Sequence, residues 1–396
     1  MTIFGYGKTT KAIIEKFGGC TVYDDKFFAV TYDKKGNEFL PPEMFEAKKS
    51  DIEVTSPGIP PSNHLIKKAK NLISEYDLFA DKMPYSIWIS GTNGKTTTTN
   101  MMQHLLKKRG SVAGGNVGNP LANLDEKANI WILETSSFTL HYTNKAVPNL
   151  YVLLPISPDH ISWHGSFEIY EKTKLKPLDN MREGEAVILP KKYASYPTKA
   201  FKILYEDAND LSKYFDIDID KVKFKEPFLT DALLALGVNK ILFDEIDYKK
   251  INSFEIGRHR VEEFKDTKGR LWINDSKATN ANATIAALKS YKDKKINLIL
   301  GGDDKDADLT PLFEELQCYK VQIFAIGKNA NKLDKLSHKY NISSLVCNTL
   351  ENAVKAIDKM DKKDINLLSP AAASLDQFSS YTKRGDDFIN LVKNLS

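Results

Sequence analysis

The residues with the clearest chemical signature form one run, Ser90-Gly91-Thr92-Asn93-Gly94-Lys95-Thr96-Thr97. An apolar run at 87–89 precedes them, and a helix-like segment follows as far as Lys108. A strand, a glycine loop, Lys-Thr and a helix form the layout that holds a nucleoside triphosphate, because loop amides and the helix N-terminus face the phosphates. Lys95 is therefore expected to reach the β- and γ-phosphates, and the Thr96 hydroxyl to bind Mg²⁺.

This loop is shorter than the general phosphate-loop pattern, which has Gly at the position that Ile89 occupies. The simpler alternative is a Gly-Asn turn followed by a Thr-rich helix start. Four consecutive threonines are poor helix formers unless their hydroxyls are used, and this favours the nucleotide-binding interpretation.

Two other side chains are expected to bind metal beside this loop. Glu134 closes the apolar run 130–134, and His160 is expected to close the strand region of the apolar run 150–156. Neighbouring parallel strands end at one edge of a sheet, so both side chains are expected near Lys95. Carboxylate is the usual ligand of Mg²⁺ or Mn²⁺, whereas imidazole is less usual for Mg²⁺. A helix-capping or hydrogen-bonded core histidine is the alternative for His160.

The first part of the chain carries a weaker nucleotide signal. The strand expected at 2–5 runs into Gly5-Tyr6-Gly7, which lacks the third glycine of a dinucleotide fingerprint. Asp24 ends the strand expected at 20–23, where a ribose-binding acid would lie. Ser56-Pro57-Gly58 follows the strand expected at 51–55. Ligands collect at the carboxyl ends of such strands, although ordinary turn chemistry explains the same residues.

Three polar loops follow strands in the last part of the chain, at 274–280, 301–305 and 369–376. If they share one sheet edge, they form a small polar pocket in which Lys277 and Lys305 bind a carboxylate substrate. Solvated turns are the alternative. Strands are expected here at 271–273, 296–300, 321–326 and 365–368.

Strand–helix alternation recurs in three segments and predicts an α/β protein with parallel sheets. We place the boundaries at 1–80, 81–255 and 256–396. The net charge of +4, with 42% hydrophobic and 27% charged residues, is ordinary for a globular protein and gives no reason to expect nucleic acid. Cys20, Cys318 and Cys347 are too far apart for a metal motif, and no apolar run spans a bilayer. These features favour a cytoplasmic protein without membrane insertion. We also expect a monomer.

Taken together, these motifs resemble the Mur ligase family, the ATP-dependent amide-bond ligases of peptidoglycan precursor synthesis. The resemblance covers essentially the whole chain and includes the short form of the glycine loop. The other motifs in family order are Glu134-Thr135-Ser136-Ser137-Phe138, Asp159-His160, 170–175, His259-Arg260 and 275–280. Within the family, 275–280 and 369–378 resemble members that add D-glutamate to UDP-N-acetylmuramoyl-L-alanine. The Asp-Asn-Pro-Arg motif of the diaminopimelate-adding members is absent.

The resemblance implies three domains: a Rossmann-like domain for the UDP-sugar, a central phosphate-loop domain for ATP, and a Rossmann-like domain for the amino acid. It also implies that ATP phosphorylates the substrate carboxylate and that the D-glutamate amine attacks the acyl phosphate. Two Mg²⁺ or Mn²⁺ ions are implied, the first on Thr96 and Glu134 and the second on His160. Lys174 matches the lysine that the family carbamylates with CO₂; an ordinary surface lysine is the alternative.

Other site residues follow from the same resemblance. Arg260, Asp275 and Asp231 match ATP contacts, and Asn116 with 56–58 matches the UDP-sugar site. Arg258 stands where the family has proline, and Phe228 where it has a second adenine-side asparagine. The residues at D-glutamate positions are Lys305, Thr279, Ser374, Leu375 and Tyr381, with Tyr381 replacing a phenylalanine ring.

Two alternatives remain at this point. A folylpolyglutamate synthase shares the loop and a glutamate-adding chemistry, but lacks a separate UDP-binding domain. A nucleotide-binding regulatory protein without catalysis has no reason to keep Glu134, His160, Lys174 and Lys277 together.

Overall fold

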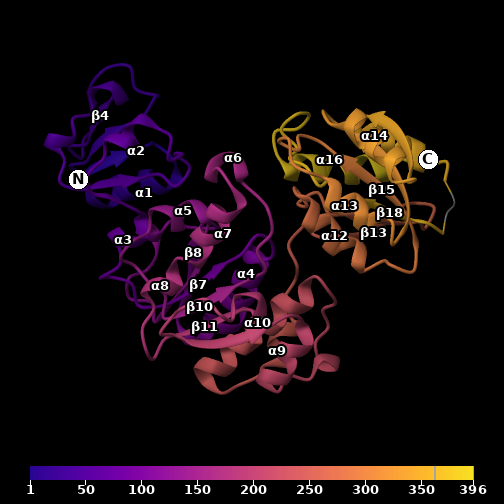
Figure 1. The fold of residues 1–396 in the computed structure, drawn as a ribbon, viewed down its shortest axis with the longest axis horizontal. Helices are drawn as coiled ribbons and strands as arrows, with labels where there is room; N and C mark the ends of the chain where they lie inside the picture. Colours follow the sequence, from indigo (N-terminus) through magenta and orange to yellow (C-terminus); the bar gives the residue numbers. More distant parts are fainter. Residues whose placement is uncertain (361–362, 396) are drawn as a thin grey trace. The chain divides into compact units, whose positions relative to one another are not determined.

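The computed structural model describes residues 1–360 and 363–395, and they contain three six-stranded sheets. The chain divides into two compact units, residues 1–224 with 228–254 and residues 225–227 with 255–396. The first unit holds two of the sheets, coloured indigo to magenta in Figure 1, and the second holds the orange-to-yellow sheet. Strand–helix alternation in the sequence therefore produced the expected α/β sheets.

The first sheet has the strand order β3-β4-β2-β1-β5-β6, and only the edge strand β3 runs antiparallel. The strands predicted at 2–5, 20–23 and 51–55 are present as β1, β2 and β5, each shorter by one or two residues. The strands are β1 (Thr2–Phe4), β2 (Thr21–Tyr23), β3 (Thr31–Tyr32), β4 (Glu38–Leu40), β5 (Glu53–Thr55) and β6 (Leu72–Ile73). The helices are α1 (Lys8–Phe17), α2 (His64–Lys68) and α3 (Glu75–Leu78), with 3₁₀ turns η1 (Pro42–Met44) and η2 (Ala47–Lys49).

The second sheet is parallel throughout, with the order β12-β11-β10-β7-β9-β8. Its strands are β7 (Tyr85–Ser90), β8 (Ser111–Gly115), β9 (Ile130–Glu134), β10 (Leu150–Leu153), β11 (Ala186–Pro190) and β12 (Phe201–Tyr205). Its helices are α4 (Lys95–Leu106), α5 (Ser137–Tyr142), α6 (Ile161–His164), α7 (Phe167–Leu175), α8 (Pro177–Asn180), α9 (Ala208–Phe215), α10 (Phe228–Phe243) and α11 (Tyr248–Asn252). The 3₁₀ turns are η3 (Lys107–Arg109), η4 (Leu121–Asn123), η5 (Lys191–Tyr193) and η6 (Ile219–Lys221).

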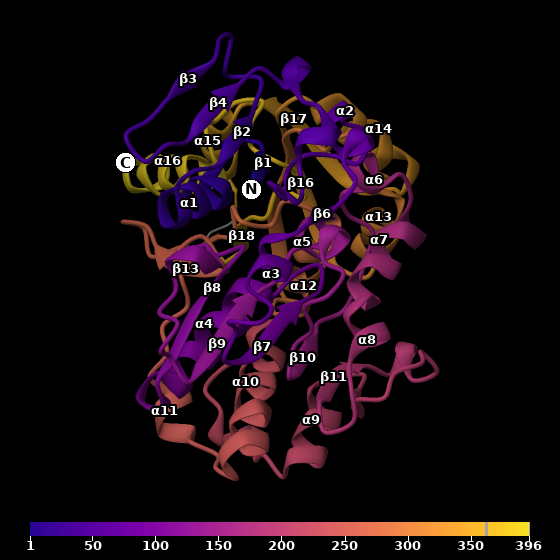
Figure 2. The ribbon, with the colours of Figure 1, turned by 90° about the vertical axis from the view of Figure 1, so that its left-hand side faces the viewer.

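The central strand β7 has β9 on one side and β10 on the other. Ile89 pairs with Glu134 of β9 and with Val152 of β10, so three loops emerge together at one edge of this sheet. Figure 2 shows α4 beside β7 and β9, and α10 packs against α4. This arrangement places the glycine loop between the end of β9, where Glu134 lies, and the end of β10, which precedes His160 in the chain.

A continuous hydrophobic core joins the first and second sheets. Ile3 and Val54 of the first sheet belong to the same cluster as Trp88 and Trp131 of the second. The α3 residues that bridge them are Tyr76, which is fully buried, and the following Phe79. Burial of large aromatic side chains of this kind contributes about 1.5–3 kcal/mol each, and it makes the first unit one packed body.

The third sheet has the order β13-β14-β18-β15-β16-β17, with only the edge strand β13 antiparallel. Hydrophobic clusters cover it: one joins β15 with α12 and α13, and another joins β18 with α15 and α16. Its strands are β13 (Glu262–Lys265), β14 (Leu271–Asn274), β15 (Lys295–Gly301), β16 (Lys320–Ile326), β17 (Ser343–Asn348) and β18 (Ile365–Leu368). Its helices are α12 (Ala281–Lys289), α13 (Thr310–Leu316), α14 (Ala330–Lys339), α15 (Leu350–Ile357) and α16 (Tyr381–Lys393).

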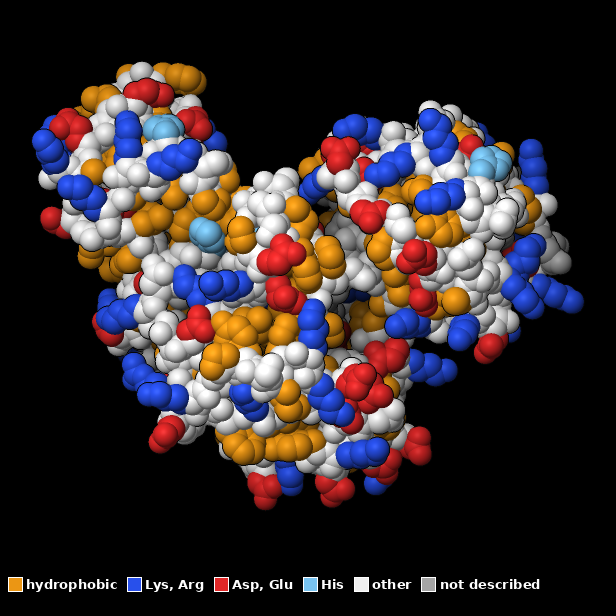
Figure 3. All heavy atoms as spheres, in the orientation of Figure 1, with side chains coloured by type: hydrophobic (Ala, Val, Ile, Leu, Met, Phe, Trp, Pro, Cys, Tyr) orange, Lys and Arg blue, Asp and Glu red, His pale blue; other side chains and the backbone are white. Residues whose placement is uncertain are grey.

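Charged side chains of both signs are interspersed on the face drawn in Figure 3. Among the described residues, none of the helices combines the length and the apolar character that crossing a bilayer requires.

Candidate active site

The glycine loop joins β7 to α4, and its two glycines are required by space and by backbone conformation. Gly91 has φ +135°, and a Cβ there would lie 2.5 Å from the Leu154 Cβ. Gly94 has φ +85°, and a Cβ there would lie 2.7 Å from Asp231 Oδ1. These φ values are unfavourable for other L-residues, so the loop lies directly against its neighbours and exposes its backbone.

The loop combines free amide donors with a lysine. The amides of Gly94 and Thr96 donate to no group among the described residues, whereas that of Thr92 donates to Pro155 O at 3.1 Å. Lys95 Nζ donates to Gly91 O at 3.0 Å and to Thr92 O at 2.7 Å. Open amides at the start of α4 with an ammonium beside them suit an anion, and the phosphate-binding role stays a prediction. Asn93 and Thr96 are half-buried in the same turn, and Thr97 is buried.

Lys174 lies beneath this loop, and the surface-lysine alternative is wrong, because only 1% of the residue is exposed. Its Nζ donates to Gly91 O at 2.8 Å and to Ser90 Oγ at 3.3 Å, and it lies 4.9 Å from the centre of the Tyr170 ring. Burial lowers the pKa of Lys174 well below its usual value, and the nearby Lys95 lowers it further. The negative charges of Asp159 and Glu134 oppose this shift. The environment therefore favours a neutral, nucleophilic amine.

Glu134 provides the carboxylate that a metal would need. It is 2% exposed at the end of β9, and its Oε1 accepts a hydrogen bond of 2.8 Å from Asn116 Nδ2. Its Oε2 is buried and has no donor among the described residues. A buried carboxylate oxygen without a hydrogen-bond donor, at the edge of a phosphate loop, is suited to coordinate Mg²⁺.

His160 is placed differently from the expectation. Strand β10 ends at Leu153, and His160 follows after six intervening residues as the N-cap residue of α6, in the left-handed conformation with φ 53°. The prediction that it closes the strand region is thus wrong, because Pro155 and Pro158 break the apolar run. Its side chain makes no cap hydrogen bond; it lies 3.7 Å from Asp159 Oδ2 and packs against the Phe138 ring at 4.7 Å. Within residues 1–360 and 363–395, no three His, Cys, Asp or Glu side chains converge on a metal position.

Asp231, predicted to contact adenine, lies below the glycine loop. It is 4% exposed near the start of α10, and its Oδ1 accepts a hydrogen bond of 2.6 Å from Thr98 Oγ1 of α4. The same oxygen faces Gly94. Asp231 therefore links α10, through a hydrogen bond, to the point where the glycine loop joins α4.

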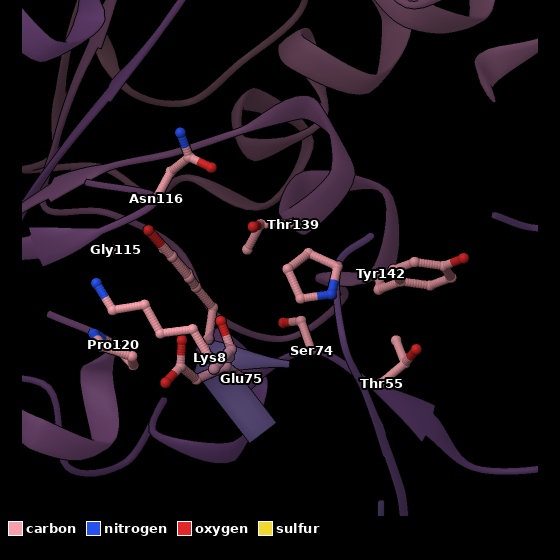
Figure 4. A pocket seen from close by; sticks show the side chains of 12 residues that line it. Lys8, Thr55, Ser74, Glu75, Gly115, Asn116, Pro120, Thr139 and Tyr142 are labelled. Carbon is pink, nitrogen blue, oxygen red and sulfur yellow. The ribbon is translucent and has the colours of Figure 1, made fainter. Parts of the chain in front are cut away.

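A pocket of 140 Å³ opens between the ends of the first and second sheets, within the first unit. In Figure 4, Asn116, Lys8 and Glu75 lie toward one end of it, and Thr55 and Tyr142 toward the other. Asn116 and Pro57, both predicted for the UDP-sugar site, line it; Ser56 and Gly58 adjoin Pro57 in the chain. The complete lining is Lys8, Thr9, Thr55, Pro57, Ser74, Glu75, Tyr76, Gly115, Asn116, Pro120, Thr139 and Tyr142.

The first glycine loop is occupied by protein contacts. A Cβ on Gly5 would lie 2.9 Å from the Ser56 Cβ, so these two loops pack directly. Asp24 accepts from Tyr6 N at 2.6 Å and from Lys26 N at 3.0 Å, and Gly7 N donates to Thr10 Oγ1 at 3.0 Å. Asp24, the acid predicted to bind the ribose, thus accepts a hydrogen bond from a loop amide with each of its two carboxylate oxygens.

Several pocket residues were missed by sequence reasoning, chiefly Lys8, Glu75, Tyr76 and Tyr142. Tyr76 OH lies 3.3 Å from Glu134 O and 3.2 Å from Thr135 Oγ1, which links the pocket wall to the end of β9. The segment 74–79 carries no motif; its only signal is a Ser followed by acids, the pattern of a helix N-terminus.

In the second unit, β14, β18 and β15 are neighbours, so their following loops meet as predicted. Asp303 N donates to Ala373 O at 2.9 Å, which joins two of these loops. Asp275 accepts from Ser369 Oγ at 2.8 Å and from Val261 N at 3.3 Å. Burial raises the pKa of Asp275 to about 7, against the lowering effects of these donors and of the positive charge of Arg260.

The predicted D-glutamate residues are arranged around these loops. Lys277 Nζ lies 4.1 Å from the centre of the Tyr381 ring, and Ser276 Oγ donates to Tyr381 O at 2.8 Å. Ser374 is buried, whereas Thr279, Lys305 and Leu375 are exposed. The loop edge therefore presents an ammonium, hydroxyls and an exposed apolar side chain.

Comparison with known proteins places these features in a family. The Mur ligase middle domain model matches residues 89–221, and the model described as "Mur ligase, glutamate ligase domain" matches 259–372. The chain is 53% identical over 400 residues to the UDP-N-acetylmuramoylalanine--D-glutamate ligase of Campylobacter jejuni strain 81-176, covering 100% of both chains. The chain belongs to the Mur ligase family. The ligase of the same name from Helicobacter pylori strain J99 is 44% identical, with 98% of each chain covered.

Mur ligases of known structure share this fold. The MurF ligase of Thermotoga maritima, solved with ADP, superposes with a TM-score of 0.58 at 16% identity, over 86% of this chain and 88% of that one. At 16% identity the similarity shows the fold alone, and that fold includes the three-domain α/β architecture predicted from the sequence.

Proposed function

We propose that this Mur ligase joins D-glutamate to UDP-N-acetylmuramoyl-L-alanine, with ATP converted to ADP and phosphate, in the cytoplasm and as a monomer. The observation that carries the proposal is the 53% identity, over the whole chain, to a ligase of that name. The chemistry at the glycine loop is consistent with it: open amides, Lys95, and a buried acid and amine within the same unit.

The central difficulty of the reaction is electrostatic, because a carboxylate must attack the γ-phosphorus of a polyanion. Lys95 would place its positive charge beside the β- and γ-phosphates, and the amides of Gly94 and Thr96 would bind phosphate oxygens. In this step a carboxylate oxygen bonds to the γ-phosphorus, the bond from that phosphorus to the bridging oxygen breaks, and ADP leaves. The resulting acyl phosphate carries an activated carbonyl. The D-glutamate amine attacks that carbonyl, the C–O bond to phosphate breaks, and phosphate leaves.

Divalent metal would supply further positive charge at the transferred phosphoryl group. Thr96 and Glu134 would hold one ion, since Glu134 Oε2 is buried without a donor among the described residues. His160 would serve a second ion. Its exposed ring is compatible with that role, and Asp159 Oδ2 lies 3.7 Å from its Nε2.

Lys174 would complete the second site after modification. Its neutral Nζ attacks CO₂, an N–C bond forms, and one proton leaves, so that an amine becomes a carbamate anion. Burial supports this step because it lowers the pKa of Lys174 and so favours the unprotonated amine. The carbamate oxygens would then be electron-pair donors that can bind a metal ion, whereas the ammonium or amine of Lys174 donates hydrogen bonds.

The substrates are assigned to the two units as follows. The 140 Å³ pocket with Asn116 would hold part of the UDP-sugar, and the glycine loop would hold the phosphates of ATP. Residues of the second unit that would bind D-glutamate are Lys277, Thr279, Lys305, Ser374, Leu375 and Tyr381, and those that would contact ATP are Arg260 and Asp275. We also keep the domain boundaries at 1–80, 81–255 and 256–396 as part of the proposal.

The test is ATP-dependent phosphate release with UDP-N-acetylmuramoyl-L-alanine, comparing D-glutamate with L-alanine, L-lysine and diaminopimelate. Release with D-glutamate alone is the expected result. Release with another amino acid, or with a folate substrate in place of the UDP-sugar, would assign the chain to a different amide ligase. No release with any combination would favour a nucleotide-binding protein without catalysis.

A further inference from the structure

One acid in the wall of the 140 Å³ pocket has no part in the chemistry above. Glu75 begins α3, is 7% exposed, and lines the pocket with Lys8, Thr9 and Asn116 (Figure 4). A carboxyl group at this depth loses most of its contact with water, so its charge state depends on the protein groups around it.

The position of Glu75 is fixed by its neighbours. Its Oε1 accepts a hydrogen bond of 3.2 Å from Ala122 N at η4, and the amide of Leu121 also donates to the carboxyl group. Helix α3 is anchored on either side of it: Ser74 Oγ accepts from Asp77 N at 3.1 Å and from Thr143 Oγ1 at 2.8 Å. Glu75 is therefore held at the pocket wall by hydrogen bonds from more than one element.

The charged and titratable groups around Glu75 do not neutralise it. Lys8 of α1 lines the same pocket but directs its ammonium to Gly118 O, and Lys16 of α1 donates to Ala122 O and pairs with Glu126. Tyr76 on α3 and Tyr142 on α5 complete the titratable lining, and Glu134 lies behind the Tyr76 hydroxyl.

Among the described Lys, Arg and His residues, none forms an ion pair with Glu75. Burial accordingly raises the pKa of Glu75 to about 8, against the opposing effect of the two amide donors. The acid is thus mostly neutral at pH 7.

The remaining lining suits an anionic occupant. Lys8 and Thr9 form the first turn of α1, where backbone amides and the helix dipole favour negative charge. An ionised Glu75 in the same small space would repel such an occupant, whereas a neutral carboxyl group would offer an O–H donor. The two protonation states therefore differ in their affinity for an anion.

We propose that Glu75 binds the sugar nucleotide as a protonated acid, donating its O–H to an anionic oxygen of that substrate, so that substrate binding is coupled to proton uptake. The inference rests on the proposed function, since it takes the UDP-sugar as the occupant of this pocket. The anionic oxygen belongs to the diphosphate or to the alanyl carboxylate, which share this chemistry. The proton stays on Glu75, and no covalent bond changes.

The direction of the pH effect follows from linkage. An anion that accepts from the acid stabilises its protonated form, so the pKa in the complex lies above its value in the free protein. Between these two values the dissociation constant rises with pH by at most about tenfold per unit, and below about pH 7 it is flat. Binding is the appropriate measurement, because turnover would also report ionisation of the D-glutamate amine.

The experiment is titration calorimetry of the full chain with UDP-N-acetylmuramoyl-L-alanine, from about pH 6.5 to about pH 9.5, in two buffers of different protonation enthalpy. Glu75→Gln keeps a neutral hydrogen-bond donor at this position and removes the titratable carboxyl group. Glu126→Gln is the matched control, because that carboxylate is ion-paired with Lys16 and does not line the pocket. The same titrations with UDP-N-acetylglucosamine, which lacks the alanyl carboxylate, show which group of the substrate accepts the hydrogen bond from Glu75.

We expect wild type and Glu126→Gln to take up a proton on binding above about pH 8, and Glu75→Gln to bind with no uptake and a flat pH profile. Uptake with both ligands assigns the diphosphate as acceptor, and uptake with the complete substrate alone assigns the carboxylate. Binding by wild type without uptake, or unchanged uptake in Glu75→Gln, overturns the inference. If Glu75→Gln fails to fold, proton uptake by the wild type on binding still tests the inference, because its absence overturns it. No binding of the UDP-sugar by folded wild type overturns the proposed function itself.

Discussion

The two glycine loops of the first unit look alike in sequence but are used differently. Each follows a parallel strand and precedes a helix, β1 to α1 for one and β7 to α4 for the other. In the first loop, an acid of the protein binds the backbone amides: Asp24 accepts from Tyr6 N and Lys26 N. In the second, two lysines bind the backbone carbonyls, since both Lys95 and Lys174 donate to Gly91 O.

The difference shows what a strand–glycine–helix pattern leaves undetermined. The backbone geometry creates an anion site only if its amides remain free. Asp24 supplies an internal anion to the first loop, which stabilises the loop and leaves its ligand contacts to α1 and the neighbouring pocket. The second loop keeps the amides of Gly94 and Thr96 available and has the Lys95 ammonium beside them. The side chains surrounding a loop therefore decide whether it cradles phosphate.

The largest effect is expected from removal of the lysine in the second loop. Lys95→Ala should lower kcat by about 10²–10³-fold, because a cation placed at the developing phosphoryl charge is lost. Steady-state phosphate release measures this. Lys108→Ala, an exposed lysine just beyond the same helix, is the control and should leave kcat unchanged. A Lys95→Ala enzyme within a few-fold of wild type would contradict the phosphate-loop assignment.

Lys174→Ala should also be nearly inactive, with a loss on the order of 10²-fold, but it should respond to chemical rescue. If the missing group is a carbamate, acetate or another short carboxylate restores part of the activity and methylamine does not. Activity is measured with each additive at matched ionic strength, and exposed Lys172→Ala is the control. Rescue by the amine alone would mean that Lys174 acts as a cation, like Lys95.

Asp231 and Asp24 provide a matched pair for the two loops. Asp231→Asn replaces the carboxylate that accepts from Thr98 Oγ1 beneath the second loop by a neutral amide, at a cost of about 1.5 kcal/mol. We expect the KM for ATP to rise by about tenfold, with little change in the KM for the UDP-sugar. Substrate titrations at fixed concentrations of the other substrates measure both values. Equal rises for ATP and the UDP-sugar would show that Asp231 supports the whole unit rather than this loop.

Asp24→Asn should have the smallest effect. It replaces one acceptor oxygen by an NH₂ donor that faces a backbone N–H, at a cost of about 1 kcal/mol. The KM for the UDP-sugar should rise a few-fold and that for ATP should stay constant, with exposed Asp25→Asn as the control. A large loss of UDP-sugar binding without loss of thermal stability would indicate that Asp24 contacts the substrate directly, as the sequence alone suggested.

Most of the fold was predictable because its signals are local. The runs that became β7, β9 and β18 are apolar and bounded by polar loops, and their ends were predicted within two residues. His160 was misplaced, because its distance from β10 depends on how the chain turns after Leu153. Glu75 and Tyr76 were missed, since their role arises from contacts with η4 and with the end of β9.

The sequence by itself determined which residue types could do chemistry: a glycine loop with Lys95, an acid after one neighbouring strand, and polar loops after the strands of the third sheet. These follow from spacing and periodicity, which depend on backbone geometry alone. The tertiary structure decided their charge states and partners. The pKa of Lys174 is lowered and Glu75 is expected to hold its proton because distant segments bury both side chains, and desolvation depends on every element that excludes water from a site.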